Sequence, residues 1–574
     1  MYSNEPLFLG LDLSTQQLKG VLINCHKQVV DEITVSLVDE FPEFATTNGR
    51  YVDGDVVTAP VLMWVAAVDT LMARLAASGF AQRICGISGA AQQHGSVYWR
   101  QQGVEALQQL DPKLSLRQQL EDSAFAVLNS PIWEDSSTGK QCRELEQHAG
   151  GAWMLAHITG STAFERFTGP QIAKLKETQP DAWSTVSRIS LVSSFIASLL
   201  IGNVAPIDCS DATGTNIYDV QKKEWSQELC DFIDPRLKQV LGARVVMATS
   251  TVGQLSPYFA QRYGMAQCPV VAFTGDNPSA FAGFESLFAT AGHSAAVISL
   301  GTSDTVLFPL SAYPYVATDP LKFQHPDGHV LQHPTKTNEY VAMLCYKNGS
   351  LARDWVRERS LGASSSWVDF SSAANIQPMV PNALGFYYLA TEILPYAKGV
   401  FRFEKCSEGD LVCPSGAKYK QIEAFSAING NDARAIIESQ FMSMCVDYRR
   451  KEAGALTGVA ITGGASRNQA IQQAISDILG VPVFAAGIQT NKGVDKQALA
   501  MPAYGGAIRA LNQLDTAVNS SSKPKTDSAV SYVLERICSP NNNNHAVYAQ
   551  ALADFEFLRD FASRTSSTKQ TLAI

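Results

Sequence analysis

An acid and an amide, Asp276 and Asn277, stand at a point of the sequence where proteins of mixed α/β fold bind their ligands. The apolar run 269–273 predicts a buried strand, and the glycine and proline near its end predict a turn before a helix over 279–287. Ligands of α/β proteins bind beyond such strand ends, so Asp276 is a candidate catalytic carboxylate. An Asp at this place is also a common helix cap, and Asp276 taken alone favours the cap.

Three other stretches combine small residues with hydroxyl groups or a carboxylate, as a phosphate site requires. Each follows an apolar run that predicts a strand, and the carboxylate of the first could hold Mg²⁺ through water. Taken alone, each stretch is more often an ordinary turn, so only their joint occurrence favours phosphate binding. The candidate residues are Asp12, Ser14 and Thr15 in the first stretch, Gly301 and Thr302 in the second, and Gly463, Gly464, Ala465 and Asn468 in the third.

A histidine and two amides follow another predicted strand, in the stretch GISGAAQQHGSVYW. Their side chains, those of Gln92, Gln93 and His94, can donate as well as accept hydrogen bonds. This suits a ligand with several hydroxyl groups. A histidine in a loop is more often merely solvated, which is the alternative to ligand binding for His94.

Other common phosphate and metal motifs are missing from the sequence. It contains neither GxxxxGK[ST] nor a GxGxxG after a strand, which argues against a P-loop and against a nicotinamide dehydrogenase. His325, His329 and His333 are separated by prolines and a glycine that break any helix able to align them, so we predict no metal site there.

Two of the candidate stretches share one structural plan and lie about half the chain apart. Residues 6–23 and 294–310 each consist of an apolar strand, a turn with glycine and hydroxyl groups, and a second apolar strand, which predicts two β-hairpins. Such a repeat predicts two similar lobes, with the connection near 284–292. We therefore expect an N-terminal lobe over 1–288 and a C-terminal lobe over 289–574, both of mixed α/β type.

The clearest alternation of strand and helix lies in residues 458–486. An apolar strand, a Gly-Gly turn, an amphipathic helix and a second strand follow one another there. Ile471, Ile475 and Ile478 fall on one face of the predicted helix, and Gly480 ends it.

Composition and charge narrow the class of protein. The chain has 574 residues and a hydrophobic fraction of 46%, as in ordinary globular proteins. Its net charge of −9 argues against a nucleic-acid or anionic-membrane partner. Its eleven scattered cysteines are typical of reduced thiols in the cytoplasm, and no apolar run is long enough to span a bilayer. These features predict a cytoplasmic monomer or small homo-oligomer.

Together, the motifs resemble the FGGY family of carbohydrate kinases. The resemblance implies a two-lobed actin-like ATPase fold, which is ribonuclease H-like, with a sugar-binding N-terminal lobe, a nucleotide-binding C-terminal lobe and the active site in the cleft between them. It extends in order from about residue 7 to about residue 550 and is carried by GLDLSTQQLKG, SGAAQQHGSVYW, TAFERFTGPQIAK, TGDNPSA, SLGTSDT, SWVDFS and TGGASRNQAI, among other stretches.

The resemblance also implies roles for single residues. Asp276 matches the catalytic base of the family, and Asn277, His94 and Arg166 match its sugar contacts. The nucleotide contacts match Trp367, Gly463, Gly464, Ala465 and Asn468. Two of these residues also have a structural alternative. Arg166 could form a structural ion pair, and Trp367 could be an aromatic side chain of the core. Many bacterial members carry Met before the sugar-contacting His, where this chain has Gln93.

Within this family, the closest resemblance is to the eukaryotic branch that acts on D-xylulose. It implies transfer of phosphate from ATP, with Mg²⁺, to the 5-hydroxyl of that sugar, as a step of pentose catabolism. The alternatives are a kinase for another ketose or polyol, such as ribulose, glycerol or gluconate, and a non-catalytic actin-like sugar sensor.

Overall fold

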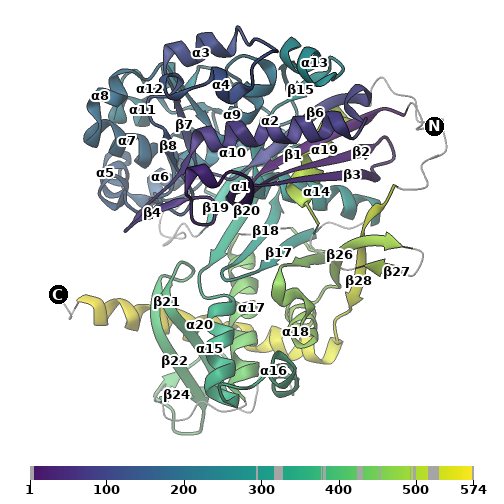
Figure 1. Cartoon of the computed structure of the whole chain (residues 1–574). Helices are drawn as coiled ribbons and strands as arrows, with labels where there is room; N and C mark the ends of the chain where they lie inside the picture. Colours follow the sequence, from purple (N-terminus) through teal and green to yellow (C-terminus); the bar gives the residue numbers. More distant parts are fainter. Residues whose placement is uncertain are drawn as a thin grey trace. The chain divides into compact units, whose positions relative to one another are not determined.

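The chain forms two compact units in the computed structural model shown in Figure 1. Unit 1 comprises Met1–Leu287, Tyr315–Val341 and Leu499–Tyr532, and unit 2 comprises Phe288–Pro314, Ala342–Ala498 and Val533–Ile574. The structure describes residues 5–291, 295–315, 328–375, 378, 383–422, 431–451, 454–490, 493–495, 499–514 and 529–571.

Unit 1 is built on a sheet of seven strands in the order β14-β15-β6-β1-β2-β3, with β16 also paired to β6. The pairs β1–β2 and β2–β3 are antiparallel, whereas β1 and β16 both run parallel to β6. The strands are β1 (Leu7–Leu13), β2 (Gln17–Asn24), β3 (Val29–Ser36), β6 (Ile84–Ala91), β14 (Thr251–Gln254), β15 (Pro269–Val271) and β16 (Thr274–Gly275).

Helices cover both faces of this sheet. Every residue of β1 is buried, as its almost wholly apolar sequence LFLGLDL requires of a central strand. Gly10 of β1 faces helix α19, while Gly20, which pairs with Leu11, faces Leu71 of helix α2 on the opposite side. The main helices of unit 1 are α2 (Val61–Ala77), α5 (Gly139–Ala149), α6 (Ala152–Thr159), α7 (Thr168–Thr178), α9 (Val192–Ile201), α10 (Cys209–Ala212), α11 (Gln227–Ile233), α14 (Asp276–Ala291) and α19 (Met501–Leu514).

Helix α19 packs into unit 1 by direct contact between backbones, although it comes late in the chain. A Cβ atom on Gly10 would lie 1.8 Å from the carbonyl oxygen of Ala503, and one on Gly505 would lie 1.9 Å from that of Ser279. Only glycine permits these approaches. Figure 1 shows α19 in yellow-green against the purple strands of the sheet.

Unit 2 contains a second mixed sheet with the strand path β20-β18-β17-β25-β26-β27, and β28 also pairs with β26. Here β17 and β18 form an antiparallel hairpin, and β25 runs parallel to both β17 and β26. The strands are β17 (Ala295–Leu300), β18 (Asp304–Leu310), β20 (Tyr340–Tyr346), β25 (Gly458–Thr462), β26 (Val483–Thr490), β27 (Gly493–Asp495) and β28 (Ser531–Cys538).

A smaller antiparallel sheet, in the order β21-β22-β24-β23, completes the strands of unit 2. Its strands are β21 (Ala383–Glu392), β22 (Ala397–Lys405), β23 (Leu411–Val412) and β24 (Lys418–Ile422). The helices are α15 (Ser350–Leu361), α16 (Trp367–Ala374), α17 (Asp432–Arg450), α18 (Gln469–Leu479) and α20 (Asn542–Thr571). No helix in the described part of the chain has both the length and the apolar character needed to cross a membrane.

The structure confirms the predicted hairpins, which are β1–β2 and β17–β18. It also confirms the amphipathic helix, because α18 buries Ile471, Ile475 and Ile478 and ends before Gly480, which has a φ of 71°. Both units combine mixed sheets with helices, as the alternating pattern predicts.

We predict that Gly10→Ala destabilises the protein, because the added methyl group would collide with the backbone of α19. Overpacking of this kind lowers the free energy of unfolding by about 1–3 kcal/mol. Gly20→Ala is the matched control on the paired strand, since its Cβ would meet only side-chain carbon atoms at 3.4 Å or more. Urea unfolding of both variants measures the difference, and equal stability of the two would contradict this account of the α19 contact.

Candidate active site

Asp276 lies at the junction where β16 passes into α14. Strand β16 pairs in parallel with the end of β6, Gly275 opposite Ala91, so this junction is a carboxyl end of the sheet. Gly275 leaves the space that a neighbouring side chain fills, because a Cβ there would lie 2.4 Å from Cγ of Gln93. The sequence therefore places the acid where the strand stops and lets Gln93 pack directly beneath it.

Hydrogen bonds hold the Asp276 carboxyl at the entrance to the helix. Its Oδ1 accepts from the backbone N–H of Asn277 at 2.8 Å and from the Asn277 side-chain amide at 3.1 Å. The same amide donates to Oε1 of Gln93 at 3.0 Å. Although Asp276 is partly exposed, enclosure of its carboxyl by protein atoms raises its pKa to about 6, against the opposing effect of these hydrogen bonds.

A second carboxyl, that of Asp12, belongs to the other strand that flanks β6. Asp12 pairs with Ala90 of β6, one residue before the Gly275 pair, so the two acids emerge on either side of β6. Burial, and then the charge of Asp276, raises the pKa of Asp12 to about 8, while Lys19 opposes the shift. Oδ1 of Asp12 is buried and has no hydrogen-bond partner among the described residues.

The turn that follows Asp12 is closed by its own groups. Ser14 donates to the carbonyl oxygen of Gln17 through its backbone N–H, at 2.9 Å, and through its hydroxyl, at 3.0 Å. Thr15 accepts from the indole N–H of Trp133 at 3.0 Å. These contacts fix the shape of the turn, as the ordinary-turn alternative requires.

His94, at the end of β6, is buried and neutral. Its Nδ1 lies 2.9 Å from the carbonyl oxygen of Gly214, which can only accept, so Nδ1 carries the proton and Nε2 keeps its lone pair. Burial, and then the charge of Arg166, lowers the pKa of His94 to about 3. The ring stacks on Phe167 with centroids 4.4 Å apart. His94 is therefore an oriented hydrogen-bonding group, and the interpretation as a solvated loop residue is wrong.

Arg166 is held beside His94 by an imidazole and two aromatic rings. Its Nη2 donates to Nε2 of His329 at 3.0 Å, and its guanidinium lies 5.0 Å from the ring centroid of Phe164 and 5.7 Å from that of Phe167. His329 belongs to β19 (His329–Gln332), in the segment of unit 1 that follows residue 315.

The three histidines considered as a metal site have different surroundings. His329 contacts Arg166, while Nε2 of His333 lies 3.4 Å from a carboxylate oxygen of Glu285. His325 lies outside the described residues. Within the described residues, the group able to gather three metal ligands is elsewhere and contains neither His329 nor His333.

Two buried acids that sequence reasoning missed hold residues next to the site by hydrogen bonds. Asp208 caps α10 by accepting from the backbone of Ser210 at 3.0 Å, and it also accepts from the hydroxyl of Thr274 at 2.9 Å. Asp211 accepts from the Ser193 hydroxyl at 2.5 Å. Burial raises the pKa of Asp208 to about 7, and burial followed by the charge of Asp208 raises that of Asp211 well above its ordinary value. Nothing in their local sequence distinguishes them from exposed acids, because burial is a tertiary property.

In unit 2, a buried ion pair shapes the turn between β17 and β18. Asp304 bonds to Arg353 at 2.7 and 3.0 Å and also accepts from the N–H of Gly301 at 3.1 Å. The carbonyl oxygens of Gly301 and Thr302 accept from the backbone at the start of α15. The sequence marked this turn through Gly301 and Thr302, but Asp304 and Arg353, which hold it, were missed.

The Gly-Gly stretch lies beside this turn, because β17 and β25 are parallel neighbours with Ser299 opposite Thr462. A Cβ on Gly463, whose φ is 89°, would lie 2.3 Å from the Leu300 carbonyl oxygen, whereas one on Gly464 would meet open space. Exposed backbone therefore follows β25, and the next residue, Ala465, continues it within the short 3₁₀ turn Gly464–Arg467.

Asn468 and Trp367 are linked through helix α16. Asn468 caps α18 by accepting from the N–H of Ile471 at 3.2 Å, and its amide donates to Ser371 of α16 at 2.7 Å. Trp367 begins α16, one turn before Ser371, and is 41% exposed with Arg357 over its ring. Its exposure rules out the alternative of a core aromatic.

Comparison with known proteins shows which family carries these two groups of residues. Residues 120–283 match the N-terminal domain, and residues 296–494 the C-terminal domain, of the FGGY family of carbohydrate kinases. The chain belongs to this family. It is therefore an ATP-dependent sugar kinase by membership, with a sugar and ATP as its substrates.

Curated relatives and solved structures agree with this membership. The chain is 42% identical to the xylulose kinase of Rattus norvegicus over 486 residues, which cover 83% of this chain and 84% of the relative. It is 41% identical to xylulose kinase 2 of Arabidopsis thaliana over 491 residues, with 84% of each covered. Among solved structures, a gluconate kinase from Lactobacillus acidophilus matches with a TM-score of 0.72 at 16% identity, over 98% of this chain and 99% of that one. The FGGY chain thus has the actin-like two-domain α/β fold.

We predict that Asp211→Asn is tolerated while Asp211→Ala is not. Because burial raises the pKa of Asp211, the folded protein favours the neutral carboxyl, which a neutral amide can replace. Asp211→Ala removes the acceptor of the buried Ser193 hydroxyl and should lower the free energy of unfolding by about 1–3 kcal/mol. Denaturation at pH 7 compares the two variants, and equal destabilisation would show that the site needs a charged carboxylate.

Proposed function

We propose that this kinase transfers the γ-phosphoryl group of ATP to the 5-hydroxyl of D-xylulose, as a step of pentose catabolism. The relatives that support this substrate are named xylulose kinase in an animal, a plant and a yeast and are 42%, 41% and 38% identical to the chain. The observation that carries the proposal is the Asp276 carboxyl, held at the end of β16 and raised in pKa, in the same unit as a neutral His94 and an oriented Arg166.

Asp276 is the catalytic base in this proposal. Its carboxylate takes the proton of the attacking sugar hydroxyl, and Asn277, which holds the carboxylate, also bonds a neighbouring hydroxyl. Nε2 of His94 is an acceptor, whereas Arg166 only donates, so the pair matches sugar hydroxyl groups, which do both. Gln93, which positions the Asn277 amide, fixes the orientation of the base.

The nucleotide is assigned to unit 2 together with the turn after Asp12. Thr15 and Thr302 offer hydroxyl groups to the phosphates. The Ser14 hydroxyl donates to the carbonyl oxygen of Gln17 in this structure, so it would have to exchange that bond for one to a phosphate. Gly301 offers close approach rather than a donor, because its N–H is already bonded to Asp304. The adenosine portion is assigned to the exposed backbone after β25 and to helix α16, which comprises Gly463, Gly464, Ala465, Asn468 and Trp367.

Asp12 fits the Mg²⁺ that accompanies ATP in this proposal. Its buried Oδ1 lacks a hydrogen-bond partner among the described residues, and hard cations prefer carboxylate oxygen. When bound, Mg²⁺ would neutralise charge on the transferring phosphoryl group. A cation beside Asp12 would also favour its ionised form, against the burial that raises its pKa.

The proposed location of the enzyme in the cell rests on its reduced cysteines. All eleven cysteines, which lie in the described part of the chain, are thiols rather than disulfides, and six of them are buried. Free thiols in this number are typical of a reducing compartment, so we place the enzyme in the cytoplasm, as a monomer or small homo-oligomer.

We expect ADP release from ATP and Mg²⁺ to be strong and selective with D-xylulose. A coupled assay over D-xylulose, L-xylulose, D-ribulose, glycerol and gluconate tests this, because the hydroxyl groups placed by His94 and Arg166 differ among these molecules. Higher kcat/KM with another member of the panel would overturn the substrate while keeping the kinase. No turnover with any of them would overturn both and favour a sugar sensor.

We predict that kcat/KM for the sugar falls tenfold per pH unit as the pH drops below about 6. The sign follows from the raised pKa of Asp276, because the base works only when ionised and is protonated below that value. If kcat/KM began to fall only near pH 4, the pKa of Asp276 would not be raised by its enclosure. As a control, Asp276→Asn should lower kcat by about 10²–10⁴-fold while calorimetry still detects sugar binding. Retained turnover in that variant would eliminate Asp276 as the base.

A further inference from the structure

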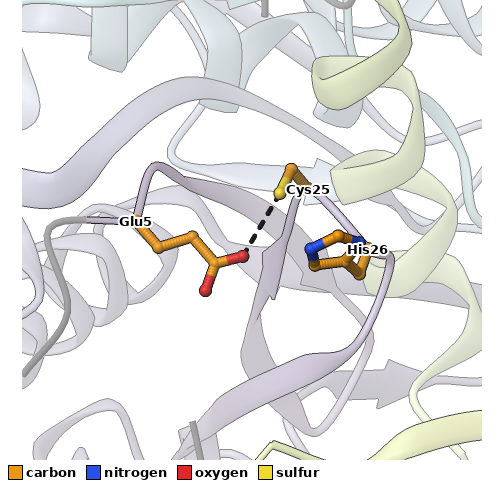
Figure 2. A group of neighbouring side chains, drawn as sticks. All are labelled: Glu5, Cys25 and His26. Atoms are coloured by element: carbon orange, nitrogen blue, oxygen red, sulfur yellow. Dashed lines mark hydrogen bonds between the residues drawn. The ribbon is translucent and has the colours of Figure 1, made fainter. Parts of the chain in front are cut away.

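A thiol, an imidazole and a carboxylate meet at the end of the β1–β2 hairpin that is remote from the Ser14–Thr15 turn. Cys25 and His26 lie in the turn between β2 and β3, and Glu5 comes just before β1. Leu7 pairs with Asn24 in the antiparallel register, so the residue that enters β1 lies beside the turn that leaves β2. Figure 2 shows the three side chains together.

The β2–β3 turn is held rigidly by a buried amide. Oδ1 of Asn24 accepts from the backbone N–H groups of His26 and Gln28, both at 3.0 Å. The backbone of Asn24 also bonds to Gln28 and Lys27 at 3.0 Å, and Lys27 has a left-handed φ of 62°. Cys25 and His26 are therefore presented by a fixed backbone rather than by a loose loop.

The third residue is anchored independently. The carbonyl oxygen of Glu5 accepts from Nε of Arg83 at 3.1 Å, which fixes its backbone while its side chain reaches the turn. Oε1 of Glu5 lies 3.2 Å from Sγ of Cys25. One ligand atom from each of Glu5, Cys25 and His26 lies within 4.8 Å of the other two, and all three residues are partly buried. In Figure 2 the imidazole lies beside the same thiol and carboxylate.

We propose that Glu5, Cys25 and His26 bind a Zn²⁺ ion, with water in the fourth position. Thiolate, imidazole and carboxylate are the three ligand types of zinc sites, and two such ligand atoms on a tetrahedral ion lie about 3.5 Å apart. Because no two of the three ligand atoms lie more than 4.8 Å apart, side-chain shifts of about 1 Å bring them to that spacing. The thiol argues against Mg²⁺ and Ca²⁺, which select oxygen. Binding releases the thiol proton to solvent.

This site lies apart from the proposed phosphoryl transfer. The eight residues of β2 separate it from the Ser14–Thr15 turn, which is roughly 25 Å at the rise of a strand. The turn does contact the packing of unit 1, because Lys27 donates to Ser286 of α14 at 3.3 Å and accepts from Tyr504 of α19 at 3.2 Å. A bound ion would cross-link the start of β1 to this turn, and stabilisation is its expected effect.

Metal titration of the full-length, reduced and chelator-treated protein tests the proposal. We expect about one equivalent of Zn²⁺ to compete with a chromophoric chelator, and Co²⁺ to give a sulfur-to-metal charge-transfer absorption. Cys25→Ser should abolish that absorption, and His26→Gln and Glu5→Gln should each weaken Zn²⁺ binding at least about tenfold. Kinase turnover should be unchanged in all three, which shows that they fold.

Cys85→Ser is the matched control, because Cys85 is an exposed thiol outside the cluster. It should leave the absorption and the Zn²⁺ affinity unchanged. The proposal is overturned if the charge-transfer band survives Cys25→Ser, if Cys85→Ser removes it, or if the unmodified protein binds no stoichiometric Zn²⁺. If Cys25→Ser fails to fold, His26→Gln decides the test. An unchanged Zn²⁺ affinity in that variant would equally overturn the proposal.

Discussion

The parallel pairing of β6 with both β1 and β16 is the constraint on which the site of unit 1 depends. It brings the ends of three strands to one edge of the sheet, so that Asp12 and Asp276, which are far apart in sequence, flank the same strand. His94 follows the end of β6 itself. Unit 2 repeats the arrangement, because the β17–β18 hairpin has β25 as its parallel neighbour, and Gly301 and Gly463 emerge beside each other.

Burial determines the protonation states of the groups at this edge. It raises the pKa of Asp276 and Asp12 and lowers that of His94, so the acids hold protons more tightly and the imidazole stays neutral. A neutral imidazole with one nitrogen bonded to a carbonyl is an oriented acceptor. The same burial that makes these groups costly to charge leaves Asp276 and His94 with defined hydrogen-bond partners.

Backbone contacts of α19 hold the edge in place from the opposite side of the sheet to α2. Gly505 meets the backbone of α14 at Ser279, three residues after Asp276. Arg509 of the same helix is fully buried and donates to the Ser279 hydroxyl at 2.8 Å and to the Gly89 carbonyl oxygen at 2.6 Å. The late segment of the chain thus braces both β6 and the helix that begins with the proposed base.

The sequence by itself determined the local elements and the residue types at their ends. Apolar strands, glycine turns and one amphipathic helix were predicted and confirmed, because these depend on periodicity and on backbone conformations that a few residue types allow. The family could be identified for a similar reason, since its motifs are short stretches at strand ends.

Only the tertiary structure decided which distant residues support these motifs. The roles of Asp208, Asp211, Asp304 and Arg353 depend on burial and on partners 18 or more positions away, which no local pattern encodes. The return of α19 to unit 1 depends on close approach at Gly10 and Gly505, and isolated glycines look alike in a sequence. Pairings between distant segments are set by packing, so their physical cause lies in contacts that exist only after the chain has folded.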